Sequence, residues 1–216
     1  HLGITRTYST HTNHDGDNDI ISAIQAQHGN WPSNKYMNVI VCQDPAGAAG
    51  YTYNPSNWNT GMQAGIFMRH DYMGTIGTSG TFARHTLSHE VGHWLNLSHC
   101  WGGNNNPGQA SACNDDDNVD DTPRTIGWTS CNVNGNTCSN DAADGYWTSD
   151  VIDNVQNIME YSYCSTMFTQ GQAARMQTAL NSGTAGRDDL WQTSNLNATG
   201  TNGNGPLCEA AFSSDV

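Results

Sequence analysis

The sequence predicts a loop-rich domain of the α+β class with few helices, on three grounds. Asp, Asn, Gly, Ser and Thr are abundant whereas Glu, Lys and Leu are scarce, a composition that favours turns over helices. Short apolar runs in the first third of the chain are separated by Asn, Pro and Gly, as short strands are. Residues 102–148 are almost wholly polar and show little periodicity. At 216 residues, the chain has the length of a single domain.

Charge and composition exclude several classes of protein. The chain has 20 acidic residues, 7 basic residues and no Lys/Arg cluster, so at a net charge of −13 we expect no binding to nucleic acid. No apolar run approaches the roughly 20 residues of a membrane-spanning helix, so we expect no membrane span. A hydrophobic content of 36% with 7 Trp and 8 Tyr can build a core, which argues against disorder.

The first third of the chain predicts one short helix and three short strands. The helix covers residues 20–27 and ends at Gly29. Apolar and β-branched runs bounded by turn residues predict the strands, at 36–42, 50–53 and 65–68.

Two further helices are predicted. The stronger signal follows a Gly/Thr/Ser loop: Ser79 or Thr81 can cap the helix, and its apolar residues continue as far as Leu97. The other helix covers residues 169–180. The tail after Asn195 is rich in Asn, Gly and Thr and predicts a linker.

Residues 89–93 read His-Glu-Val-Gly-His and lie on the stronger helix. Because positions i and i+4 share one helix face, His89 and His93 can offer two imidazoles to one metal ion. Glu90 points about 100° to one side, where a general base would stand. A tetrahedral zinc would still need one protein ligand and a water. The same pattern can also arise by chance on an ordinary helix.

His99 is the candidate for the third ligand. It follows His93 by six residues, and a straight helix would carry it about 9 Å further along. The helix must therefore end and the chain must turn back, which Asn96 permits because Asn adopts the left-handed conformation. The competing candidate, His85, would lie about 12 Å from His93 along the axis, so we expect it to be a surface or supporting residue.

Two other patterns indicate a site. Residues 157–161 read Asn-Ile-Met-Glu-Tyr; Met159 is either an ordinary core residue or the floor of a site that also contains Tyr161. Residues 115–121 contain five carboxylates in seven positions, either as a solvated loop or around Ca²⁺, which takes six to eight oxygen ligands. This is no EF-hand loop, because the Gly and the terminal Glu are missing.

Cysteine usage indicates disulfides in an oxidising compartment outside the cytoplasm. Five of the seven cysteines fall between positions 100 and 164, and none forms a C-x-x-C pair, so a zinc ribbon is not expected. The chain starts at His1 without a signal peptide, so we expect a processed or truncated species.

Residues 89–99, followed by Trp101-Gly102, resemble the zinc motif of metzincin metallopeptidases, and within them the pappalysin family, in particular its cytophagalysin-like bacterial branch. The likeness covers most of the chain, with further matches at 3–7, 35–39, 74–77, 121–123, 159–161 and 167–172.

This resemblance implies a metzincin-type zincin fold in a single catalytic domain, residues 1–216. An upper subdomain, about 1–99, would hold a small twisted mixed sheet and the active-site helix. A loop-rich, disulfide-stapled lower subdomain with a C-terminal helix would follow at about 100–195, and residues 196–216 would form the linker-like tail.

The resemblance also implies roles for individual residues. His89, His93 and His99 would ligate a catalytic zinc, Glu90 would be the general base and acid, Met159 would form the Met-turn, and Tyr161 would help to stabilise the transition state. A structural Ca²⁺ would bind Asp117, Asp120 and Thr122. The two disulfides would be Cys113–Cys138 and Cys131–Cys164, which leaves Cys42, Cys100 and Cys208.

The sequence departs from the family pattern at two positions. Asn96 replaces the usual Gly of the extended motif. Tyr163 stands where some relatives have an acid just before the last loop cysteine, so the resemblance does not carry over the preference of those relatives for basic P1′ residues.

We therefore expect a secreted zinc endopeptidase that acts as a monomer on proteins or peptides and has lost further domains from either end. The alternative is a non-catalytic, calcium-stabilised surface or adhesion module with a vestigial zinc site, which would not need Glu90. A structural-zinc domain would need a fourth protein ligand, and none is evident.

Overall fold

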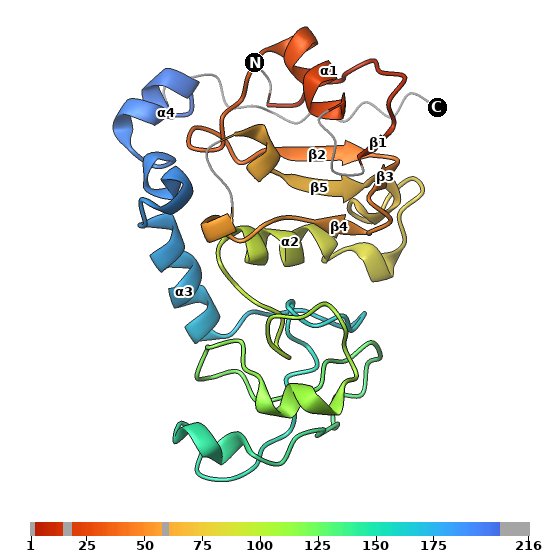
Figure 1. The fold of residues 1–216 in the computed structure, drawn as a ribbon, viewed down its shortest axis with the longest axis vertical. Helices are drawn as coiled ribbons and strands as arrows, with labels where there is room; N and C mark the ends of the chain where they lie inside the picture. The colour runs from red at the N-terminus through yellow and green to blue at the C-terminus, as the bar shows by residue number, and fades with distance from the viewer. Residues whose placement is uncertain (1–2, 15–18, 58–60, 204–216) are drawn as a thin grey trace.

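The computed structural model describes residues 3–14, 19–57 and 61–203. Figure 1 shows a small sheet between helices in the upper half of the molecule, whereas loops and short 3-10 helices make up the lower half. Among the described residues, no helix combines the length and the apolar character that crossing a membrane requires.

The sheet has three strands in the order β2-β5-β4. β2 (Val39–Cys42) is parallel to β5 (Ile66–Arg69), and β4 (Gly50–Tyr51) is antiparallel to β5. The three predicted strands are thus present: β2 and β4 are shorter than predicted, and β5 is shifted by one residue. Two strands that were not predicted, β1 (Asn13–His14) and β3 (Asp44–Pro45), form a separate parallel pair.

A helix covers each face of this sheet (Figure 1). Successive side chains of a strand point to opposite faces. Phe67 accordingly packs among the isoleucines of α1 (Asp19–His28), and the next residue, Met68, packs against Trp94 of α2 (Thr86–Trp94). Both clusters are buried, so the hydrophobic effect fixes α2 against the sheet.

Two disulfides hold the loops of the lower half together. They join Cys113 to Cys138 and Cys131 to Cys164, the pairing that the family resemblance implies. Cross-links stabilise such a half mainly by restricting its unfolded chain.

Two other cysteines, Cys42 and Cys100, are buried free thiols. Burial raises the pKa of both, so they remain protonated at neutral pH. Cys208 lies outside the described residues.

Two helices run from the lower half back to the upper half along one side (Figure 1). They are α3 (Gln170–Leu180) and α4 (Thr193–Thr199). On α4, the side-chain amide of Asn195 donates to the Lys35 carbonyl at 3.2 Å. The end of the expected lower subdomain therefore contacts the upper half. The prediction of a linker from residue 196 was wrong for residues 196–199, which belong to α4 because tertiary contacts fix this helix.

The three predicted helices are confirmed, but the predicted caps of α2 were wrong. Thr81 begins a separate 3-10 helix, and His85, without a side-chain cap, precedes α2. Thr169, by contrast, forms a capping box with Gln172 at the start of α3. The 3-10 helices are Pro55–Asn57, Met62–Ala64, His70–Tyr72, Thr81–Ala83, Ala110–Asn114, Asp141–Asp144 and Thr184–Asp189.

Candidate active site

Helix α2 carries His89, Glu90 and His93, and a turn directly after the helix brings in His99. Asn96 has φ of 73°, the left-handed conformation expected of it. The Leu97 amide then donates to the Gly92 carbonyl at 2.9 Å, so the chain folds back over the last turn of the helix.

The three imidazoles converge through their Nε2 atoms. Nε2 of His93 lies 3.1 Å from Nε2 of His89 and 3.1 Å from Nε2 of His99. In the described part of the chain, these residues are the only group of three or more His, Cys, Asp or Glu arranged to hold a metal ion. His85 does not join them.

Backbone carbonyl groups determine which nitrogen of each histidine carries the proton. Nδ1 of His89 contacts the Ile158 oxygen at 2.7 Å, Nδ1 of His93 that of Leu97 at 2.8 Å, and Nδ1 of His99 that of Asn104 at 3.0 Å. Since a carbonyl oxygen only accepts, each Nδ1 is the donor, and each neutral ring directs an Nε2 lone pair at the other two.

A cation is the group that fits three convergent lone pairs. Two nitrogens about 2.0–2.1 Å from a tetrahedral zinc are about 3.4 Å apart, close to the separations found here. Burial lowers the pKa of all three histidines, that of His99 to about 3, so the rings are neutral at pH 7 as ligation requires. The donor set therefore fits a zinc ion.

Glu90 lies beside this group with its side chain buried. Burial raises its pKa to about 8. The described residues provide its carboxylate with no hydrogen bond. On β4, a Cβ at position 50 would lie 3.2 Å from Glu90 Cγ, so the glycine there leaves room for this side chain.

Met159 lies under the helix and is fully buried with Leu97 and Cys100. Its sulfur occupies the space that a side chain at Gly92 would need. The preceding residue, Ile158, is the one whose carbonyl orients His89. This turn therefore supports both the helix and a histidine of the site.

Tyr161 borders the site from the same turn. Its ring centroid is 5.5 Å from that of His89 and 5.1 Å from that of His99. Burial, and then the charge of Glu90, raise the pKa of Tyr161 to about 12. Its hydroxyl therefore keeps its proton at neutral pH and donates a hydrogen bond to Oδ1 of Asn105.

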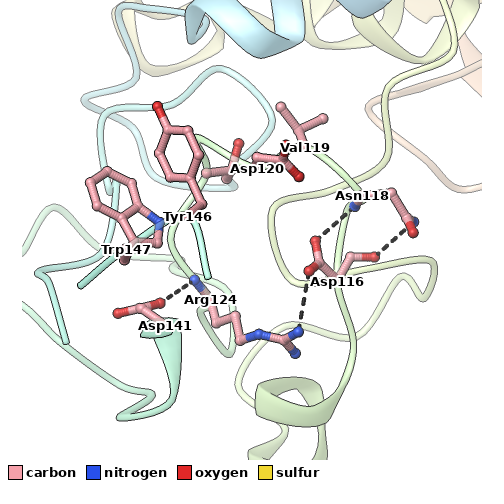
Figure 2. A pocket seen from close by; sticks show the side chains of 9 residues that line it. Asp116, Asn118, Val119, Asp120, Arg124, Asp141, Tyr146 and Trp147 are labelled. Carbon is pink, nitrogen blue, oxygen red and sulfur yellow. Dashed lines mark hydrogen bonds and ion pairs between the residues drawn. The ribbon is translucent and has the colours of Figure 1, made fainter. Parts of the chain in front are cut away.

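The acidic loop brings two of the predicted calcium ligands together, because the Thr122 side chain interacts with the Asp117 carboxylate and opposes the rise of its pKa. Asp120 and Thr122 line a pocket of about 280 Å³. Figure 2 shows this pocket and labels all of its lining residues except Thr122. Asp117 does not line this pocket; it is buried, with Oδ1 accepting from the Val119 amide at 3.0 Å.

Sequence reasoning missed Asn104, Asn105 and Arg175. Asn104 contacts His99 and Asn105 contacts Tyr161 from a loop, and Arg175 on α3 contacts Asn96. No regular sequence spacing predicts these contacts. The run of three Asn at 104–106 was the visible signal.

The α2 helix with H-E-x-x-H, the third histidine after a turn and the buried methionine below define a metallopeptidase fold of the metzincin class. Comparison with protein families matches residues 20–181 to the peptidase M43 family, described as "Pregnancy-associated plasma protein-A". The chain belongs to this family, the pappalysins, as its motifs predicted.

Its curated relatives are named extracellular metalloproteases. Extracellular metalloprotease 1 of Coccidioides posadasii is 29% identical over 190 residues, which are 85% of this chain and 62% of that protein. An extracellular metalloprotease of Colletotrichum graminicola is 35% identical over 136 residues, 60% of this chain and 44% of that protein. The chain thus spans only part of the length of these relatives.

Similar solved structures are those of mirolysin. Mirolysin in complex with compound 9 has a TM-score of 0.65 and 25% identity, over 86% of this chain and 68% of that chain. Mature mirolysin of Tannerella forsythia with a cleaved peptide has a TM-score of 0.63 and 26% identity, over 86% and 65%. These similarities confirm the predicted metzincin-type α+β fold.

Proposed function

We propose that this chain is the catalytic domain of a secreted zinc-dependent endopeptidase that hydrolyses peptide bonds in proteins. The observation that carries the proposal is the convergence of three Nε2 lone pairs beside an unpaired glutamate on the same helix. His89, His93 and His99 would hold the zinc.

Glu90 would be the general base and then the general acid. A bound zinc supplies Lewis acidity, which lowers the pKa of water toward neutrality and polarises the scissile carbonyl. The positive charge of a bound zinc would oppose the rise in the pKa of Glu90 that burial causes and would keep the carboxylate ionised. Glu90 would then take a proton from the attacking water and pass it to the leaving amine. The carboxylate, which has no hydrogen-bond partner among the described residues, and the room that Gly50 leaves for the Glu90 side chain support this role.

Tyr161 would donate a hydrogen bond to the oxyanion that develops on the scissile carbonyl. Its protonated hydroxyl and its position next to His89 and His99 support this role. Met159 would be the Met-turn, a role that its packing against Gly92 supports.

Secretion is supported by two observations. The two disulfides suit an oxidising compartment, and the curated relatives are named extracellular. A non-catalytic adhesion module would not need the buried Glu90 carboxylate, which has no hydrogen-bond partner among the described residues. We therefore do not favour this alternative.

The acidic loop would bind a structural Ca²⁺ through Asp117, Asp120 and Thr122. In the described structure, Oδ2 of Asp117 and Oγ1 of Thr122 are buried without a hydrogen-bond partner. Burial of such oxygens is costly unless a cation or donor compensates it. Burial also raises the pKa of Asp117 to about 8, which a bound Ca²⁺ would reverse.

Peptide-library cleavage followed by mass spectrometry tests the enzymatic proposal. Activity should be lost with o-phenanthroline and return with zinc. Glu90→Ala should retain zinc and cleave nothing, whereas Ser88→Ala, on the same helix, should cleave like the wild type. Cleavage by Glu90→Ala at the wild-type rate would refute the proposal.

For the calcium site, thermal unfolding with and without Ca²⁺ is informative. Ca²⁺ should raise the Tm of the wild type and of Asp188→Asn, a control distant in sequence from the acidic loop. Asp120→Asn should abolish the rise. An equal rise in Asp120→Asn would remove Asp120 from the site.

A further inference from the structure

The turn at residues 104–106 packs against the third histidine of the site. The Asn104 carbonyl accepts hydrogen bonds from Nδ1 of His99 and Nε1 of Trp101, each at 3.0 Å. The Asn106 amide donates to the Asn104 side chain at 2.8 Å, which closes the turn. One carbonyl thus orients His99 and anchors the loop.

The side chain of Asn105 extends from this anchored turn to Tyr161. Its Oδ1 accepts the hydrogen bond of the Tyr161 hydroxyl. The Tyr161 ring also meets Trp101 edge-on at a centroid distance of 4.9 Å, while Trp101 stacks on His99 at 4.3 Å. Tyr161 is 40% exposed, so the ring packing covers only part of this side chain.

We propose that Asn105 is a positioning residue that holds the Tyr161 hydroxyl at the metal centre between turnovers. This inference rests on the proposed function, in which Tyr161 stabilises the oxyanion. The neutral amide oxygen of Asn105 holds the phenol in place. It is a weaker acceptor than an oxyanion, because hydrogen bonds to charged acceptors are about twice as strong. Rotation about the Cζ–Oη bond then transfers the hydrogen bond from Asn105 to the substrate.

Kinetics on a double-mutant cycle test this role. In the zinc-loaded protein, Asn105→Ala should lower kcat about 5- to 30-fold with KM changed less than twofold, a fraction of the loss from removing an oxyanion donor. In a Tyr161→Phe background, the same change should alter kcat less than twofold. Asn106→Ala is the matched control, since its side chain has no hydrogen bond among the described residues, and it should leave kcat unchanged.

A merely structural role for Asn105 gives a different result. Asn105→Ala would then lower kcat equally in both backgrounds, or lower the zinc content, and either outcome overturns the proposal. Zinc content is measured by elemental analysis of each purified variant.

A second readout does not depend on activity. In metal-free protein with ¹³C-labelled tyrosine rings, Tyr161→Phe identifies the Tyr161 signals in the NMR spectrum. Asn105→Ala should shift or broaden these signals, and Asn106→Ala should not. Unchanged signals in Asn105→Ala overturn the proposal. A wild type without peptidase activity refutes the proposed function instead, and the spectra still decide whether Asn105 holds Tyr161.

Discussion

Arg175 on α3 donates its Nε–H to the carbonyl oxygen of Asn96 at 2.7 Å. Asn96 is the left-handed residue that turns the chain from His93 toward His99. The same guanidinium donates from Nη1 to the Asp117 carbonyl at 3.1 Å, in the acidic loop. A single side chain therefore connects α3 to the turn of the metal site and to the proposed calcium loop.

Replacing Arg175 should weaken the metal site and the fold together. Arg175→Met keeps most of the aliphatic stem but leaves the carbonyls of Asn96 and Asp117 without their donor. The expected loss is about 1–3 kcal/mol of unfolding free energy, with weaker zinc binding in a chelator competition. Arg84→Met, an exposed arginine next to α2, is the control and should behave as the wild type. Equal stability of the two variants would show that the Arg175 contacts contribute nothing.

Gly92 offers a direct test of the packing between α2 and Met159. A Cβ at position 92 would collide with the Met159 sulfur, and the fully buried methionine has little room to yield. Gly92→Ala should therefore cost about 1–3 kcal/mol through overpacking, although Ala favours helix. Gly103→Ala meets nothing within 4 Å and serves as the control in thermal unfolding. A Gly92→Ala protein as stable as Gly103→Ala would contradict the close packing.

These contacts show what the sequence could and could not predict. The pair His89 and His93 was predictable because helical spacing alone sets their common face. The position of His99 followed from one residue, Asn96, whose conformation is a local property. The disulfides followed only from the family resemblance, since cysteine spacing does not determine pairing.

The remaining features depend on contacts between distant segments. Asn195 meets the Lys35 carbonyl 160 residues away, and Tyr161 meets Asn105 across 56 residues. Neither residue type predicts such a partner, so the part of α4 from residue 196 on was predicted as a linker and Asn105 was missed. The caps of α2 failed for a related reason: a separate 3-10 turn beginning at Thr81 precedes the helix.

Removing the Cys131–Cys164 disulfide should destabilise the lower half. The bond closes a loop with a sequence separation of 33, and the chain-entropy model gives about 3–4 kcal/mol for a loop of that size. The double variant Cys131→Ser/Cys164→Ser should show this loss in denaturant unfolding without a reductant. A double variant as stable as the wild type would mean that the loops are ordered by other contacts.

Glu160 should make the stability of the metal-free protein fall as pH rises. The residue is 3% exposed; Oε2 accepts from the Trp128 amide at 2.6 Å, and Oε1 has no hydrogen-bond partner among the described residues. Burial raises its pKa from 4.5 to about 8. The folded protein thus binds the proton of the Glu160 carboxyl more tightly than the unfolded chain does. Its stabilising contribution is complete below pH 4.5 and is lost as the pH rises to about 8.

Glu160→Gln should flatten this dependence, because the amide oxygen still accepts from Trp128 while the side chain no longer ionises. Thermal unfolding in a chelator between about pH 5 and 8 should show a smaller drop in Tm for the variant than for the wild type. Some slope should persist, since the pKa of Asp117 is also raised to about 8 by burial. At one pKa unit per about 1.4 kcal/mol, the difference should reach a few kcal/mol near pH 8. Parallel curves for the two proteins would mean that Glu160 is ionised in the fold at neutral pH.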